Sequence, residues 1–167
     1  MMLEIKPILP EDWPLLKDVR LRALADAPEA FGTTLAQAHA YSDAEWQAKA
    51  RRFSESPPAT GCLAFIEGVP CGMASAYPSD KNSRATELTS FWVAPERRGS
   101  GVGEAMVTFL AEWAVALGFA MLEADVVEDN TRAQAFYAKV GFQKTSKSEP
   151  FRGDPSKRIL RLALDIG

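Results

Sequence analysis

A strand-to-helix turn rich in glycine and arginine carries the strongest chemical signal in the sequence. The segment reads Val93-Ala94-Pro95-Glu96-Arg97-Arg98-Gly99-Ser100-Gly101-Val102-Gly103. Three alternating glycines let the backbone turn sharply and approach a ligand closely. The helix that follows presents free N–H groups and the positive end of its dipole. The pattern predicts an anion site suited to a pyrophosphate, with a tight turn that binds nothing as the alternative.

Two familiar phosphate motifs do not fit this segment. A Walker-type loop needs Gly-x-x-x-x-Gly-Lys-Ser/Thr, and the segment contains no lysine. The dinucleotide fingerprint Gly-x-Gly-x-x-Gly would place its last glycine at Glu104 when counted from Gly99, and at Met106 when counted from Gly101. The segment therefore belongs to neither class of nucleotide-binding loop.

A second pattern follows about 30 residues further along the chain, where residues 130–142 read Asn-Thr-Arg-Ala-Gln-Ala-Phe-Tyr-Ala-Lys-Val-Gly-Phe. The two segments together resemble the GNAT N-acetyltransferase superfamily. Residues 98–103 are similar to its acyl-CoA loop, Arg/Gln-x-x-Gly-x-Gly/Ala, which follows a strand ending in Val-x-Pro. Residues 130–142 are similar to its helix Asn-x-x-Ala-x-x-Phe/Leu-Tyr-x-x-x-Gly-Phe. The resemblance covers roughly residues 60–145.

The resemblance implies acetyl-CoA as the acyl donor and assigns residues to it. Backbone N–H groups along the loop would bind the pyrophosphate, and these belong to Arg98, Gly99, Ser100, Gly101, Val102 and Gly103. Val93, with Trp92 beside it, would pair with the pantetheine arm and polarise the thioester carbonyl. Asn130 would hydrogen-bond the donor, and Tyr137 would stand near its sulfur.

Three basic residues are candidates for the 3′-phosphate of the adenosine moiety under the same resemblance. They are Arg97, Arg132 and Lys139, and the sequence alone does not choose among them.

Acetyl transfer to an amine explains why these residue types are useful. A lysine-like amine has a pKa of about 10 and is protonated at neutral pH, so a base must remove a proton. The oxyanion that forms needs a preplaced donor, such as the Val93 N–H. A tyrosine hydroxyl, here Tyr137, can protonate the leaving thiolate. The alternative for Tyr137 is simple helix packing.

Glu87 is the favoured base, and the family has a glutamate at a similar place. It precedes Val93 by six residues, so in a regular strand both side chains would point to one face. The alternative is a solvated glutamate without a role. The predicted function is direct transfer to a primary amine, of a small molecule or of a peptide or protein, in a ternary complex. The competing prediction is a non-catalytic acyl-CoA-binding or regulatory domain.

Cysteine and histidine are too few and too scattered for a metal site. Cys62 and Cys71 lie in apolar, strand-like runs and are expected in the core, while His39 lies in a polar stretch typical of a surface. A hairpin that turns at Gly68-Val69 would set Cys62 opposite Ser75 and Cys71 opposite Ile66, beyond disulfide reach. Without a nucleophilic cysteine, direct transfer is favoured over an acyl-enzyme.

Composition narrows the remaining classes. The chain has 167 residues, of which 47% are hydrophobic and 25% charged, as in a soluble globular domain. The net charge of −3 offers no basic surface for nucleic acid. No segment predicts a membrane span or a signal peptide, so we expect a cytoplasmic protein. The resemblance allows a homodimer.

The elements that must hold these residues predict one α/β (α+β) domain over residues 1–167, with a mixed sheet of about six to seven strands and about four helices. Strands are expected at residues 3–8, 61–67, 70–78, 84–93, 119–127 and 157–165. Helices are expected at about residues 10–25, 42–54, 102–117 and 131–140. Residues 27–41 predict only a loop or a short helix. Segments 25–57 and 146–157 are expected to select the acceptor.

Overall fold

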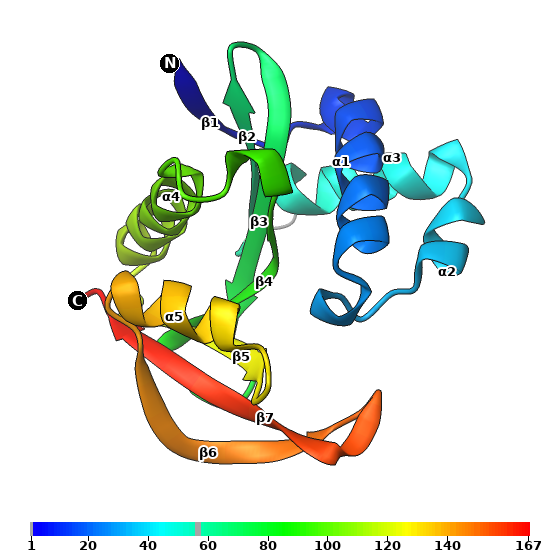
Figure 1. Cartoon of the computed structure of the whole chain (residues 1–167). Coiled ribbons are helices and arrows are strands. Elements are labelled where there is room, and N and C mark those ends of the chain that lie inside the picture. The colour runs from blue at the N-terminus through cyan, green and yellow to red at the C-terminus, as the bar shows by residue number, and fades with distance from the viewer. Residues whose placement is uncertain (1, 56–57) are drawn as a thin grey trace.

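One sheet organises the part of the chain that the computed structural model describes, residues 2–55 and 58–167. Its seven strands in those residues are β1 (Leu3–Pro7), β2 (Thr60–Ile66), β3 (Val69–Pro78), β4 (Ala85–Val93), β5 (Met121–Val127), β6 (Gln143–Phe151) and β7 (Asp154–Asp165). They lie in the order β1-β2-β3-β4-β5-β7-β6 (Figure 1). All neighbours are antiparallel except β4 and β5, which are parallel. The predicted mixed sheet is therefore confirmed.

The described residues form five α-helices, one more than expected. They are α1 (Trp13–Asp26), α2 (Leu35–His39), α3 (Asp43–Glu55), α4 (Val102–Ala116) and α5 (Thr131–Lys139). The additional helix, α2, falls in the segment for which only a loop or a short helix was expected. None of these described helices is both long and apolar enough to cross a bilayer.

Helices cover both faces of the sheet. Figure 1 shows α1, α2 and α3 on one side of the central strands and α4 on the other. Apolar residues of α4 recur at helical spacing and are buried; they include Val102, Met106, Leu110 and Ala114. A Cβ atom at Gly72 of β3 would meet Val102 and Met106 at 3.3 Å, so the strand and α4 are in close contact. β2 is buried along nearly its whole length, as a central strand covered on both faces should be.

The β2–β3 hairpin turns one residue earlier than the sequence pattern predicted. The turn is Glu67-Gly68, and Ile66 pairs with Val69. Both turn residues have positive φ, 50° and 78°, which suits the twist of a two-residue hairpin. A register shift between Ala64 and Phe65 adds one residue to β3, so Cys62 lies opposite Ala74 rather than Ser75. Cys71 is that extra residue, and Ile66, its expected partner, pairs with Val69 instead. The expected register was wrong, although both cysteines are free and buried, as expected.

The segment at residues 146–157 was expected to be a loop that helps to select the acceptor, but it is not a loop. It belongs to a hairpin in which β6 pairs with β7, and β7 in turn pairs with β5. Most residues of β6 are exposed, so the strand lacks the alternating apolar pattern from which it could have been recognised. This hairpin gives the molecule one wall of the cleft described below.

Candidate active site

Strands β4 and β5 separate halfway along their length. Their parallel pairing covers only four residue pairs and ends at Leu88 and Ala124. Residues 89–93 and 125–127 therefore leave backbone edges that, within the described chain, pair with each other nowhere. An unpaired strand edge can bind an extended ligand through main-chain hydrogen bonds. The gap between β4 and β5 is thus the natural place for such a ligand.

A β-bulge in β4 changes which side chains share a face. Thr89 pairs with Ser75 and Trp92 pairs with Met73, so β4 has one residue more than β3 over this stretch. Ser90 takes up the extra residue with a φ of 52°. The expectation that Glu87 and Val93 point to one face is therefore wrong. Because the strand is irregular between them, Glu87 lies on the face of α1–α3, and Val93 lies on the face of α4.

The glycine loop opens α4 with a row of free donors. Gly99 and Gly101 have positive φ values of 79° and 91°, a conformation that favours glycine. Among the described residues, the backbone N–H groups of residues 99–103 have no hydrogen-bond acceptor. This is expected for the first turn of a helix, whose N–H groups have no carbonyl to bind within the helix. Arg98 differs from the expectation, because its N–H turns inward to the Pro95 carbonyl at 3.3 Å.

Side chains around this loop tie it to the end of α1. The Arg98 guanidinium and the Trp92 indole N–H both donate to the carboxylate of Asp26, at 2.6 and 2.9 Å. The hydrogen bond from Trp92, followed by that from Arg98, lowers the pKa of Asp26 below its ordinary value. Ser100 donates to the Arg97 carbonyl. These contacts hold the loop while leaving its N–H groups open.

Aromatic rings close the gap on the side of α4. Phe91 lies 5.3 Å from Phe136 and 6.0 Å from Tyr137, measured between ring centroids. Gly103 makes room for this cluster, since a Cβ there would come within 2.7 Å of the Phe136 ring. Tyr137 is only 6% exposed, and burial, with a further contribution from Asp125, raises the pKa of its hydroxyl well above the ordinary value. The hydroxyl therefore stays protonated at neutral pH.

The other residues expected to contact acetyl-CoA divide into those that line the cleft and one that does not. Asn130 caps α5 by accepting a hydrogen bond from the Ala133 N–H at 3.1 Å, and it lines the cleft described below. Arg97 and Arg132 also line that cleft. Lys139 does not, and it pairs instead with Glu104 at 3.3 Å. The structure thus leaves Arg97 and Arg132 as the candidates for a phosphate beyond the loop.

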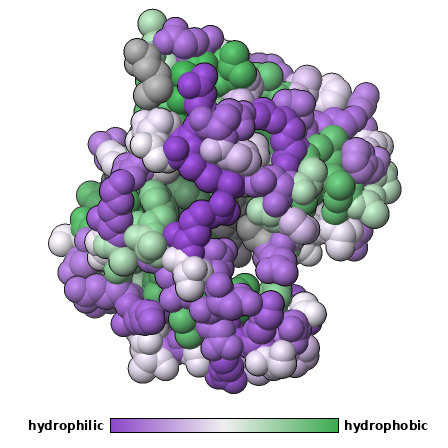
Figure 2. Space-filling view, viewed as in Figure 1, coloured by the Kyte–Doolittle hydropathy of each residue, from purple (hydrophilic) through white to green (hydrophobic). Residues whose placement is uncertain are grey.

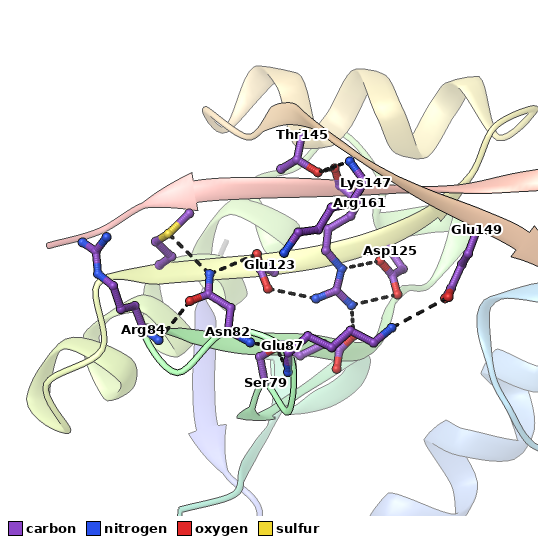
Figure 3. Close-up of polar contacts among 12 residues, drawn as sticks. Ser79, Asn82, Arg84, Glu87, Glu123, Asp125, Thr145, Lys147, Glu149 and Arg161 are labelled. Atoms are coloured by element: carbon purple, nitrogen blue, oxygen red, sulfur yellow. Dashed lines mark hydrogen bonds and ion pairs between the residues drawn. The ribbon is translucent and has the colours of Figure 1, made fainter.

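Glu87 is part of a charged cluster centred on Arg161, which sequence reasoning missed (Figure 3). The guanidinium contacts Glu87 at 2.5 Å and Glu123 at 2.8 Å, and holds Asp125 through two bonds at 3.0 and 3.1 Å. Burial acts to lower the pKa of Arg161, but the carboxylates, Asp125 foremost, outweigh it and raise the pKa. Three acidic groups thus share one guanidinium at the point where β4 and β5 separate.

Two signals in the sequence could have revealed this cluster. Arg161 interrupts an apolar run, Ile-Leu-Arg-Leu-Ala-Leu, at residues 159–164. Glu123 and Asp125 stand two residues apart in a strand and therefore share a face. A basic residue in one apolar strand and two acids on one face of another predict an ion pair, because buried charges are almost always paired.

A cleft of about 2060 Å³ runs along the strand gap, past the glycine loop and the aromatic rings. That volume is well above the roughly 300–1,000 Å³ typical of small-ligand sites, so it can hold a long donor together with an acceptor. Figure 2 shows the surface hollowed between the α1–α3 helices and the β6–β7 hairpin. The lining includes Glu87, Val93, Gly99, Gly103 and Tyr137.

Other candidate chemistries find little support in the described residues. No group of three His, Cys, Asp or Glu side chains there is arranged to hold a metal ion. Burial raises the pKa of the Cys62 thiol to about 12, which suppresses the nucleophilic thiolate. Cys71 is also buried, and neither cysteine lines the cleft. These observations favour chemistry carried by the groups around the strand gap.

Comparisons with known proteins concern the family and the fold. The sequence profile of the Acetyltransferase (GNAT) family matches residues 21–142. No curated protein sequence matches the chain significantly. Among solved structures, an acetyltransferase of the GNAT family from Streptococcus pneumoniae superposes with a TM-score of 0.82 at 19% identity, covering 99% of this chain and 100% of its own.

Two further solved structures share the fold. The ribosomal-protein-alanine N-acetyltransferase of Brucella melitensis has a TM-score of 0.75 at 20% identity, covering 97% of this chain and 99% of its own. The yncA protein of Salmonella typhimurium, solved with its cofactor acetyl-CoA, has a TM-score of 0.76 at 17% identity, covering 99% of this chain and 94% of its own. At these identities the likeness concerns the fold.

Proposed function

The chain belongs to the GNAT acetyltransferase family, and from this premise we propose that it transfers the acetyl group of acetyl-CoA directly to a primary amine, of a small molecule or of a peptide or protein, in a ternary complex. The observation that carries the proposal is the strand gap beside the donor-lined start of α4. The gap offers main-chain edges to an extended pantetheine arm. The free N–H groups of residues 99–103 suit a pyrophosphate.

The donor-binding roles follow from this placement. The N–H groups of Gly99 to Gly103 bind the pyrophosphate, and Arg97 or Arg132 meets the 3′-phosphate. Val93 binds the donor through its backbone edge, which points to the gap because the N–H of the next residue, Ala94, turns to the Cys71 carbonyl of β3. Trp92, whose indole is bonded to Asp26, holds the strand beside it. Asn130 keeps its amide N–H group available while its oxygen caps α5.

The chemical step uses groups on both faces of the sheet. Glu87 accepts a proton from the ammonium form of the acceptor, directly or through water, and the free amine attacks the thioester carbonyl. The Val93 N–H donates to the oxygen of that carbonyl as negative charge develops. When the C–S bond breaks, Tyr137 donates its hydroxyl proton toward the departing sulfur. The nitrogen loses its second proton as the amide forms, and that proton restores the Tyr137 hydroxyl through water. The products are the N-acetylated amine, the free thiol and one proton, which Glu87 releases to water.

Arg161 is a positioning residue in this scheme. Its bond to Glu87 sets the direction of the carboxylate, which faces the cleft. Arg161 also forms ion pairs with Glu123 and Asp125, so Glu87 is only one of its three partners. The cluster therefore orients the base without consuming it.

The test separates an enzyme from a binding domain. Acetyl-CoA and CoA are titrated into the protein by calorimetry, and thiol release from acetyl-CoA is then followed with a panel of amines. Binding together with amine-dependent thiol release supports the proposal. Binding without release for any amine would point to the non-catalytic acyl-CoA-binding alternative, and absence of binding would remove the donor assignment altogether.

We also propose that residues 1–167 form one domain, for which the single sheet is the support. A cytoplasmic location is supported by the two free, buried cysteines. A homodimer is part of the same proposal. Gel filtration with light scattering checks the homodimer.

A further inference from the structure

Three basic side chains gather in the cleft on the face of α1 and α3. Arg20 comes from α1, and Lys49 and Arg52 come from α3. Arg20 donates to the hydroxyl of Ser90 at 2.6 Å, which places its guanidinium at the β4 bulge. Ser90 lies three residues from both Glu87 and Val93. The basic side chains thus border the place where the proposed acetyl transfer occurs.

No carboxylate neutralises these three cations among the described residues. Ion pairs elsewhere in the described chain occupy other lysines and arginines, but none involves Arg20, Lys49 or Arg52. Each of them packs over an aromatic ring instead. The distances to the ring centroids are 4.5 Å for Arg20 over Phe31, 4.5 Å for Lys49 over Tyr41 and 6.0 Å for Arg52 over Phe53. Aromatic faces steady a cation but leave its hydrogen-bond donors unused.

The surroundings of Arg20 make this lack of an anion costly. Burial, and then the like charge of Arg52, lower the pKa of Arg20 despite an opposing effect of Tyr41. A partly buried cation beside a second cation is stabilised when an anion binds between them. The Trp46 indole N–H, buried beside Tyr41, adds a donor that has no acceptor in the described chain. This corner of the cleft is rich in hydrogen-bond donors, and among the described residues no carboxylate forms an ion pair with its cations.

The opposite wall of the cleft contributes carboxylates. Glu87 and Asp125 line it at the strand gap, where three carboxyl groups share Arg161. Glu149 and Asp154 line it from the β6–β7 hairpin, where Glu149 pairs with Lys81 and where Arg152 and Lys157 also line the cleft. The carboxylates at the strand gap suit an ammonium group, and the three cations without a carboxylate suit an anion. The β4 bulge, the expected place of the thioester, lies between the two.

We propose that the acceptor is a small amine that also carries a carboxylate, such as a free amino acid. Its ammonium group faces Glu87, and its carboxylate is held by Arg20, Lys49 and Arg52. This inference rests on the proposed function and narrows its substrate class. The phosphates of acetyl-CoA do not compete for these cations. The N–H groups proposed to bind them, at residues 99–103, lie at the start of α4 on the other face of the sheet.

The experiment compares acids with matched neutral acceptors. Thiol release from acetyl-CoA is measured with the twenty L-amino acids and with their carboxamides, at saturating acetyl-CoA. We expect at least one amino acid to exceed its carboxamide in kcat/KM by tenfold or more, since charge-assisted hydrogen bonds to the carboxylate are lost in the amide. Aminophosphonates of the same side chains show whether the cations accept other oxyanions; poor turnover of these supports a carboxylate site.

Variants assign the preference to the basic side chains. Lys49→Gln combined with Arg52→Gln should lower the acid-to-amide ratio about tenfold or more, roughly the loss of one charge-assisted hydrogen bond. Both positions are on the helix surface and partly or fully exposed, so the fold should survive, which thermal melting checks. Arg51→Gln, an exposed neighbour outside the cleft, should keep the wild-type ratio. Arg20→Lys should keep more of the ratio than Arg20→Gln.

The outcomes separate this inference from the proposed function. Carboxamides, simple amines or peptide amino termini acetylated as well as free amino acids would overturn the carboxylate site and leave the acetyltransferase intact. An acid-to-amide ratio that does not change in the Lys49/Arg52 double variant would overturn it too. Failure of every acceptor, neutral ones included, would count against the proposed function itself.

Discussion

Arg161 on β7 reaches past β5 to donate a hydrogen bond to Glu87 on β4 (Figure 3). The side chain of Arg161 is 7% exposed and that of Glu87 is 15% exposed, so the pair is largely shielded from water. Two further carboxyl groups, from Glu123 and Asp125, bind the same guanidinium. The proposed base is therefore bound by a side chain from a strand two positions away in the sheet.

The base assignment predicts a specific kinetic defect for Glu87→Gln. We expect kcat at neutral pH to fall by about 10²-fold or more, because general base catalysis contributes at least that much. The Kd for acetyl-CoA should stay close to the wild-type value, since the donor contacts lie elsewhere. Glu123→Gln is the matched control. It removes a carboxylate from the same guanidinium but does not line the cleft, and kcat should fall far less.

Arg161 predicts a stability effect that Glu87 does not share. Arg161→Met should lower the free energy of unfolding by about 3 kcal/mol or more, because three carboxyl groups would lose their shared cation. Glu87→Gln should cost at most about 1 kcal/mol, since Arg161 keeps two partners. Urea denaturation at pH 7 measures both. Equal losses for the two variants would contradict the description of Arg161 as the centre of the cluster.

Tyr137→Phe should slow the chemical step while preserving the packing of α5. The ring stays within its aromatic cluster, where Phe142 lies 5.0 Å away, so the melting temperature should change little. Loss of a general acid typically costs about 10²-fold in rate or more. Single-turnover thiol release, with donor and acceptor prebound in excess enzyme, isolates this step. A fully active variant would mean that water protonates the thiolate.

The contact between Gly103 and Phe136 predicts a steric effect on donor binding. In Gly103→Ala the new methyl group would meet the Phe136 ring at 2.7 Å, so either the ring or the start of α4 must shift. We expect the Kd for acetyl-CoA to rise about tenfold or more, in line with the roughly 1–3 kcal/mol cost of overpacking. Calorimetry measures this. Adding Phe136→Leu should restore part of the affinity, whereas no recovery would argue against a steric cause.

The buried thiol predicts how stability depends on pH. Burial raises the pKa of Cys62 from its ordinary value of 9.0 to about 12. Between those values the unfolded chain releases the thiol proton while the folded chain retains it, so the free energy of unfolding should fall as the pH rises above about 9. Urea denaturation at pH 7, 8, 9 and 10 follows this change. Cys62→Ala should flatten the decline, although the buried tyrosine hydroxyl of Tyr137 adds a similar slope above pH 10.

Local sequence patterns were sufficient for much of this protein. The glycine loop and the periodic apolar positions of α4 placed a donor-lined helix start directly after a strand, because turn geometry and helical spacing are local properties. The helix predicted at residues 131–140 also formed, over residues 131–139. These elements also carried the resemblance that the family profile confirmed.

Tertiary structure decided what depended on strand pairing. The bulge at Ser90 places Glu87 and Val93 on opposite faces of the sheet. No sequence pattern in residues 87–93 predicts this extra residue. The hairpin of β6 and β7 was missed because its exposed strand lacks an alternating pattern. Arg161 met its three carboxylates only because β7 lies beside β5, an adjacency of segments about 35 residues apart. Periodicity reports how a segment faces solvent, whereas register and neighbours are settled by packing across the whole sheet.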